Sequence, residues 1–236
     1  MQDFYPALVK TFSSARLHAY HDGESNPLNL DVVARYAHNM AVSQKLTPAL
    51  HSVEVGLRNN IHEALNAQFS DPEWYDRPGL LGAKQQMQLA SGRDKLRSAN
   101  KLETTDRLVA ELTLGFWVGL FSSNYEHHLW RANPTLLAAI FPRAPRHVRN
   151  RASISKILNP VRDLRNRVAH WERVAHDPSL NSLKQDIDRV VGWLCPAARC
   201  LLEHSDAFAG ALSPSAAAAA RTQVGACFNF EEIWSL

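Results

Sequence analysis

The sequence predicts an all-α protein, a helical bundle with additional helices and no significant sheet. Apolar residues recur at the 3.6-residue spacing of an α-helix along most of the 236 residues, and no segment is typical of a strand. Thr47-Pro48 and Asn159-Pro160 each place proline behind a capping residue, as at the first position of a helix. Hydrophobic residues make up 45% of the chain, which is enough for a substantial core.

The N-terminal elements follow from this periodicity. Apolar residues at positions 4, 8, 12, 15 and 19 indicate a first helix, which ends at the turn-rich segment 22–27. A second helix is expected over 30–45, and Thr47-Pro48 should begin a third that ends before Ser70. The third helix carries one apolar stripe, formed by Leu50, Val53, Leu57, Ile61 and Leu65.

Further helices are expected beyond a loop at 70–83. They cover 83–99, 105–121, a short stretch after Asn133-Pro134, the segment from Asn159-Pro160 to about Asp177-Pro178, and an amphipathic segment from Leu180 to Leu194. Pro196 should break the last of these helices. The Ala-rich stretch 213–220 is interpreted as a frayed final helix or a linker. The apolar and acidic tail 228–234 is interpreted as a docking segment.

These elements predict one all-α domain over residues 1–205, followed by a C-terminal extension over 206–236. No internal repeat and no firm domain boundary is visible in the sequence. The loop 70–83 is the best candidate for an insertion point.

Composition argues against several classes of protein. The longest apolar run, 112–121, is about half of the roughly 20 residues that cross a bilayer, and the N-terminus lacks the pattern of a signal peptide. Cys195, Cys200 and Cys227 have no metal-ligand spacing and indicate reduced thiols. Neither a glycine-rich phosphate loop nor a strong zinc motif occurs. We therefore expect a cytoplasmic protein with no membrane contact, no metal site and no cofactor.

Positive charge is concentrated in one segment, although the net charge of the chain is only +3. Residues 143–173 contain nine Arg or Lys but only two acidic residues, a net charge of +7. Most of the basic residues are Arg, whose planar guanidinium suits bidentate contacts to phosphate. The segment is interpreted either as a solvated helix face or as a site for a polyanion. The phosphate-binding candidates are Arg143, Arg146, Arg149, Arg151 and Arg167.

The motif 165–170 adds chemistry to this basic segment, near the expected start of its helix. His170 can transfer a proton, Arg165 is a fixed cation and Asn166 supplies an amide. Together they suffice to cleave a phosphodiester without a metal. The alternative interpretation is a structural histidine that caps a carbonyl or packs against Trp171.

A helical wheel separates the faces of this motif helix. Asn166 and His170 are i,i+4 neighbours and share a face with Arg162 and Arg173, whereas Arg165 lies on the flank. Both Arg162 and Arg165 therefore remain candidates for the phosphate contact. The residues expected to face the core are Val161, Leu164, Val168, Trp171 and Ala175.

A polar line borders the apolar stripe of the third helix and consists of His51, Glu54, Arg58 and His62. One interpretation is an intrahelical ion pair between Glu54 and Arg58, worth a few tenths of a kcal/mol. The other is a partly buried line that faces the motif helix, with Glu54 orienting an arginine or a histidine.

Three blocks, in order, resemble a known group of bacterial proteins. The motif 165–170 looks like the Arg-x4–6-His signature of HEPN domains, and the chain is more closely similar to the Abi-like (abortive infection) family. The blocks are 52–62, 111–118 and 164–172, and the resemblance spans roughly residues 30–200. Many members carry a second histidine after the motif histidine, where this chain has Trp171.

The resemblance implies a HEPN-like helical bundle and metal-independent RNA cleavage in phage defence or a toxin–antitoxin system. It implies Arg165, Asn166 and His170 as catalytic residues, with Glu54 and Arg58 as supporting groups. Arg162 and Arg173 are further supporting candidates from the wheel. The implied partners are RNA and a second copy of the chain in a homodimer, with an antitoxin protein or a small RNA as a possible antidote.

Other functions remain open at this point. The main alternative is a non-catalytic RNA- or protein-binding module in a defence complex, because Arg, Asn and His can bind phosphate without cleaving it. A toxin modified on a tyrosine by its antitoxin is disfavoured, because Tyr125 is the nearest tyrosine to the motif in the sequence. A purely structural helical protein would leave the basic segment unexplained.

Overall fold

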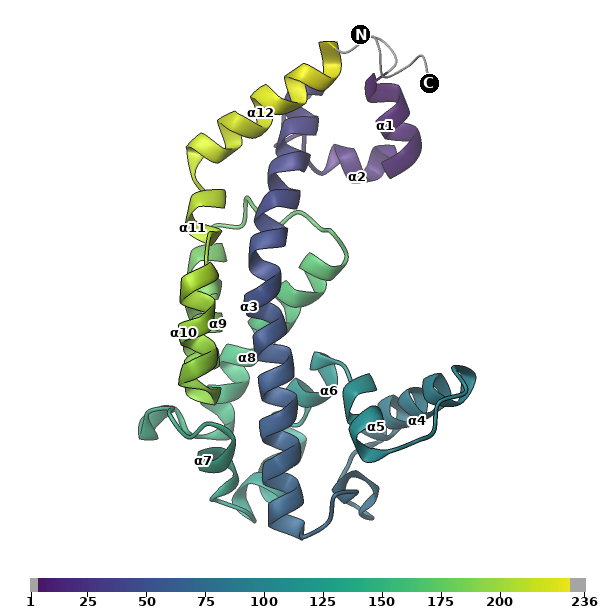
Figure 1. The fold of residues 1–236 in the computed structure, drawn as a ribbon, viewed down its shortest axis with the longest axis vertical. Coiled ribbons are helices and arrows are strands. Elements are labelled where there is room, and N and C mark those ends of the chain that lie inside the picture. Colours follow the sequence, from purple (N-terminus) through teal and green to yellow (C-terminus); the bar gives the residue numbers. More distant parts are fainter. Residues whose placement is uncertain (1–3, 230–236) are drawn as a thin grey trace. The chain divides into compact units, whose positions relative to one another are not determined.

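The structure, a computed structural model, describes residues 4–229 and is built from helices (Figure 1). No strand occurs among these residues, so the predicted all-α class is confirmed. The α-helices are α1 (Phe4–Phe12), α2 (Ser14–His18), α3 (Asn29–Phe69), α4 (Ala83–Ser98), α5 (Thr105–Glu111), α6 (Leu114–Gly119), α7 (Leu136–Ile140), α8 (Arg151–Ala169), α9 (Leu180–Leu194), α10 (Pro196–Ser205), α11 (Phe208–Ala211) and α12 (Pro214–Asn229). Within residues 4–229, no helix has both the length and the apolar character to cross a membrane.

Residue contacts divide the chain into two compact units, each assembled from segments that are distant in the sequence. Of the described residues, the first unit contains 4–48, 166–181 and 205–229, and the second contains 49–165 and 182–204. The boundaries fall inside α3, α8, α9 and α10. Helices α11 and α12, from the expected C-terminal extension, belong to the first unit. The division into a domain 1–205 and an extension 206–236 stays a prediction.

Helix α3 runs through Thr47-Pro48, so the predicted start of a new helix at this pair is wrong. Proline in a helix interior removes one backbone hydrogen bond and costs about 3 kcal/mol. Apolar residues one turn apart are buried on both sides of the proline, and this burial offsets the cost; they are Val42, Leu46, Leu50 and Val53. The Thr47 hydroxyl, which was interpreted as a cap, donates instead to the carbonyl of Ser43 at 2.9 Å.

Helix α8 begins and ends earlier than predicted. It begins at Arg151, where the Asn150 side chain caps it by accepting a hydrogen bond from the N–H of Ser153 at 2.9 Å. Asn159, expected to be the cap, lies inside the helix and donates to the carbonyl of Ser155. Because α8 ends at Ala169, the motif 165–170 lies at the C-terminal end of the helix and not near its start.

Smaller differences follow from local interactions. The predicted first helix is split into α1 and α2 at Ser13, which has a φ of 72°. The predicted helix 105–121 is split into α5 and α6 at 112–113, where the chain is extended. The predictions of α9 and of a break at Pro196 are confirmed. The Ala-rich stretch lies in α12, whereas most of the predicted docking tail, 230–234, lies outside the described residues.

The core of the second unit contains the predicted stripe of α3, whose five residues are all buried. Gly56 on the same helix permits a close approach of α9, since a Cβ there would lie 3.3 Å from Cδ1 of Leu194. Aromatic side chains complete this core; the fully buried ones include Trp74, Phe116, Trp117, Phe121 and Phe141. Helix α8 contributes Val161 and Leu164 to the core, as the wheel predicts.

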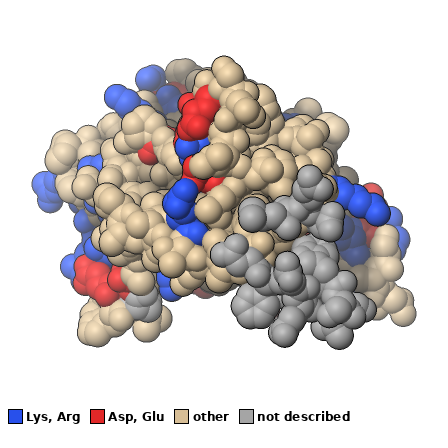
Figure 2. All heavy atoms as spheres, turned by 90° about the horizontal axis from the view of Figure 1, so that it is seen from above, with Lys and Arg blue, Asp and Glu red and all other residues tan. Residues whose placement is uncertain are grey.

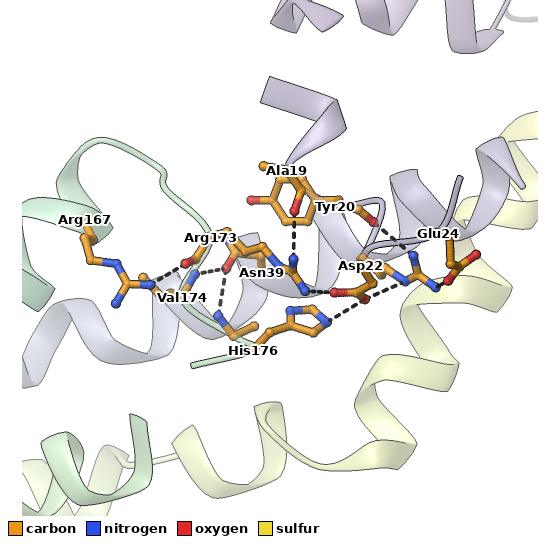
Figure 3. Close-up of polar contacts among 11 residues, drawn as sticks. Ala19, Tyr20, Asp22, Glu24, Asn39, Arg167, Arg173, Val174 and His176 are labelled. Atoms are coloured by element: carbon orange, nitrogen blue, oxygen red, sulfur yellow. Dashed lines mark hydrogen bonds and ion pairs between the residues drawn. The ribbon is translucent and has the colours of Figure 1, made fainter. Parts of the chain in front are cut away.

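A buried amide in the first unit holds the segment that follows α8 (Figure 3). Asn39 on α3 is 1% exposed, and its side-chain oxygen accepts hydrogen bonds from the N–H groups of Val174 at 2.7 Å and Ala175 at 2.9 Å. Its side-chain nitrogen donates to the carbonyl of Glu172 at 3.0 Å. One side chain thus satisfies three backbone groups of a segment that has no helical hydrogen bonds of its own.

We expect Asn39→Ala to lower the free energy of unfolding by about 2–4 kcal/mol, because it leaves buried backbone groups without partners. Urea unfolding of the two proteins measures this difference. Asn59→Ala is the matched control, since Asn59 is an exposed residue of the same helix. An equal loss in both variants would contradict the structural role of Asn39.

Candidate functional site

The motif 165–170 ends in a Schellman motif, a common way to close an α-helix. The N–H of Trp171 donates to the carbonyl of Val168 at 3.1 Å, and the N–H of Glu172 donates to the carbonyl of Arg167 at 2.8 Å. Trp171 occupies the left-handed position of this motif, with a φ of 55°. Glycine is usual at this position because it has no Cβ, so tryptophan here carries backbone strain.

His170 is the last residue before this turn, and its side chain is exposed. Its N–H donates to the carbonyl of Asn166 at 3.0 Å, and Asn166 is exposed as well. Within residues 4–229, neither side chain takes part in a hydrogen bond or ion pair. The structure therefore brings these two predicted catalytic residues together on one accessible turn of the first unit.

Trp171 is 44% exposed, which corrects the prediction that it faces the core. The helical wheel assumed that the helix continues to Asp177-Pro178. In the structure α8 ends at Ala169, and the residues after it are not helical. Helix α2 contacts the turn instead, because the Arg16 guanidinium donates to the carbonyls of His170 and Trp171 at 3.3 and 2.9 Å. Sequence reasoning missed Arg16, since no local pattern links it to a residue more than 150 positions away.

In the second unit, Arg165 is held by Glu54 of α3. Its Nε and Nη2 donate to the two carboxylate oxygens at 3.0 and 3.1 Å, a bidentate pair. The same carboxylate accepts a hydrogen bond from the N–H of Leu114 at 3.0 Å, at the start of α6. The expectation that Glu54 orients an arginine of the motif helix is confirmed, whereas its supporting role in catalysis stays a prediction.

The rest of the polar line has other partners. Arg58 donates to the side chain of its neighbour Asn59 at 3.1 Å, and no hydrogen bond or ion pair joins it to Glu54. His62 accepts a hydrogen bond from the indole N–H of Trp74 at 3.1 Å, and burial lowers the pKa of its imidazole. His62 is therefore a half-buried histidine whose Nδ1 acts as a hydrogen-bond acceptor, and both its burial and this contact favour the neutral imidazole.

Most arginines of the basic segment are neutralised by carboxylates. The ion pairs are Arg151–Glu126, Arg162–Asp163, Arg167–Asp177 and Arg173–Asp22, besides Arg165–Glu54. Arg143, Arg146 and Arg149 have no ion pair with a carboxylate in the described part of the chain. On the face drawn in Figure 2, acidic and basic side chains likewise lie next to one another. The accessible positive charge is therefore smaller than the sequence count implies.

Arg173 belongs to a polar cluster around Asp22 in the first unit (Figure 3). Arg35 also pairs with Asp22, at 3.2 Å, and Nε2 of His176 lies 3.8 Å from this carboxylate. Burial alone would raise the pKa of Asp22, but the hydrogen bond and charge of Arg173 outweigh it and lower the pKa. Burial and the charge of Arg173 lower the pKa of His176. The predicted catalytic support from Arg173 stays a prediction.

The described residues contain no group of three or more His, Cys, Asp or Glu that could hold a metal ion. No protein-family model matches the chain, and neither a curated protein nor a solved structure matches it. The resemblance to the Abi-like family therefore stays a prediction that rests on the three sequence blocks.

Loss of the carboxylate charge at residue 54 should weaken the second unit. We expect Glu54→Gln to lower the free energy of unfolding by about 1–3 kcal/mol, because a half-buried guanidinium loses its charged acceptor while an oxygen for Leu114 remains. Chemical denaturation measures the change, and a double-mutant cycle with Arg165→Met isolates the pair. Glu63→Gln is the control, because Glu63 is an exposed residue of the same helix. A coupling energy of zero between residues 54 and 165 would contradict the ion pair.

The strain at Trp171 can be measured by comparing two truncations that remove the same indole. We expect Trp171→Gly to be more stable than Trp171→Ala by about 1 kcal/mol, because glycine adopts the left-handed conformation without steric cost. Ala169→Gly, two residues earlier and in helical conformation, should instead destabilise the protein by about 0.5–1 kcal/mol. If Trp171→Gly is the less stable of the two truncations, the left-handed turn is not strained.

Proposed function

We propose that this protein is a metal-independent endoribonuclease of the HEPN type, acting as an RNA-targeting toxin in bacterial phage defence or a toxin–antitoxin system. The observation that carries the proposal is the exposed His170 at the end of α8, with the exposed Asn166 one turn before it. Arg165 precedes Asn166 directly, so a general acid–base, an amide and a cation occur within six residues. The resemblance of the motif 165–170 to the HEPN signature supports the same function.

The chemistry is an attack of the RNA 2′-hydroxyl on the adjacent phosphorus. A base removes the hydroxyl proton, and an acid protonates the departing 5′-oxygen. One histidine cannot be base and acid at the same moment, whereas two copies of His170 facing each other in a homodimer can divide these roles. This requirement supports the proposed dimer.

The pairing of Arg165 with Glu54 is compatible with a role at the phosphate. The pair uses Nε and Nη2 of the guanidinium, and a guanidinium has five N–H donors, so the two at Nη1 remain for a phosphate oxygen. Those donors would stabilise the negative charge that develops in the pentacovalent transition state. Asn166 would hydrogen-bond a phosphate oxygen or fix the tautomer of His170.

The alternative is a non-catalytic RNA-binding module. Arg143, Arg146 and Arg149 favour it, because they have no carboxylate partner among the described residues and can bind phosphate without any chemistry. In this function, loss of His170 would leave RNA binding unchanged and there would be no cleavage to lose.

The deciding experiment is incubation of total RNA with the full-length protein in EDTA. We expect cleavage products that end in 2′,3′-cyclic phosphate, and a loss of at least about 100-fold in His170→Ala, because general acid–base catalysis contributes that much. His127→Ala is the matched control, since His127 is also exposed but lies far from the motif in the sequence.

Three results would contradict the nuclease. They are a requirement for a divalent metal, equal cleavage of DNA, and unchanged cleavage in His170→Ala. RNA binding without cleavage by the wild-type protein favours the alternative function.

A further inference from the structure

A hollow of about 530 Å³ lies in the first unit beside the end of α8. Helix α2 and the residues on either side of it form one side of the hollow, and the end of α8 with the residues that follow it forms the other. The lining includes Ser13, Arg16, Tyr20, Trp171, Glu172 and Arg173. This volume is within the range of sites that hold small molecules or single nucleotides. The chemistry proposed above assigns no step to these residues, although Arg173 is a supporting candidate from the helical wheel.

Trp171 lines this hollow with an exposed indole, and its backbone is held in the strained left-handed conformation. A large aromatic residue in the left-handed conformation is costly, and such strain gathers at ligand-binding sites. The flat indole offers the surface on which a nucleobase stacks in proteins that bind single strands.

The cations at the hollow complement a phosphate. Arg16 donates through one nitrogen, Nη1, to two carbonyl oxygens and has no ion pair within the described residues, so its charge is not neutralised. Arg173 pairs with Asp22 through Nη2, but its Nε is buried without a hydrogen-bond partner. The hydroxyl of Tyr20 is also buried without a partner. Both atoms are closed off from solvent, so the phosphate contact is assigned to Arg16, which has no ion pair within the described residues.

We propose that this hollow binds one nucleotide of a single-stranded RNA, with its base stacked on Trp171 and its phosphate on Arg16. The inference rests on the proposed function in taking RNA as the ligand, and it assigns recognition of the base next to the cleaved bond to residues outside the motif. The adjacency of Trp171 to His170 in the chain would set the register between the bound base and the reacting phosphate.

The test measures binding of a fluorescein-labelled decamer of adenylate RNA in EDTA, by fluorescence anisotropy. All variants are made in the full-length His170→Ala protein, so that cleavage does not interfere. We expect Trp171→Gly and Trp171→Ala to bind about 5- to 100-fold more weakly, and Trp171→Phe to bind within about 3-fold of its parent, because stacking needs an aromatic face. Arg16→Met should weaken binding and lower its dependence on salt concentration, because it removes one phosphate contact.

Leu102→Ala is the control for loss of an exposed apolar side chain, since Leu102 is 74% exposed and belongs to the second unit. Unchanged affinity in Trp171→Gly, or equal losses in Trp171→Phe and Trp171→Gly, would overturn the inference. Equal weakening in Trp171→Gly and Trp171→Ala, despite their expected difference in stability, would show that the binding loss does not come from unfolding.

Failure of this inference and failure of the nuclease are distinguishable. RNA cleavage by the wild-type protein together with unchanged binding in Trp171→Gly keeps the nuclease and overturns the nucleotide site. RNA binding that depends on Trp171, from a wild-type protein that cleaves nothing, keeps the nucleotide site and overturns the nuclease.

Discussion

The hydrogen bonds of Asn39 are the constraint on which the candidate site of the first unit depends. This single amide fixes the backbone after α8 by bonding to Glu172, Val174 and Ala175. The Schellman turn, the exposed Trp171 and the position of Arg173 beside Asp22 all belong to the segment that it holds. An amide is well suited to this place, because it donates and accepts without bringing a charge into the interior.

Glu54 has a comparable structural role in the second unit. Its carboxylate joins α3 to α6 through Leu114 and to α8 through Arg165. The pair also shows why a charge count along the sequence overstates the positive field of the segment 143–173. Four of its arginines are paired with carboxylates that lie outside this segment. The charge that remains accessible is concentrated on fewer side chains, among them Arg143 and Arg146.

Local periodicity predicted much of the fold, because burial of one face controls where an amphipathic helix lies. Periodicity predicted which residues of α3 form its buried stripe, and it predicted both ends of α9. Proline signals were less informative, since packing on both sides of Pro48 carries α3 through a residue that often begins a helix. The i,i+4 relation of Asn166 and His170 was visible in the sequence. Arg16, which shares a hollow with Trp171, was not, because their proximity arises only from the tertiary fold.

The interleaving of the two units also has a consequence for synthesis of the protein. Neither unit is continuous in sequence: the second needs residues 182–204, and the first needs residues 205–229 as well as its N-terminal helices. Contacts between such distant segments form slowly, because long loops must close before the contacts stabilise them. A nascent chain can therefore complete its second unit before its first, because the first also needs residues 205–229, which are made after all residues of the second.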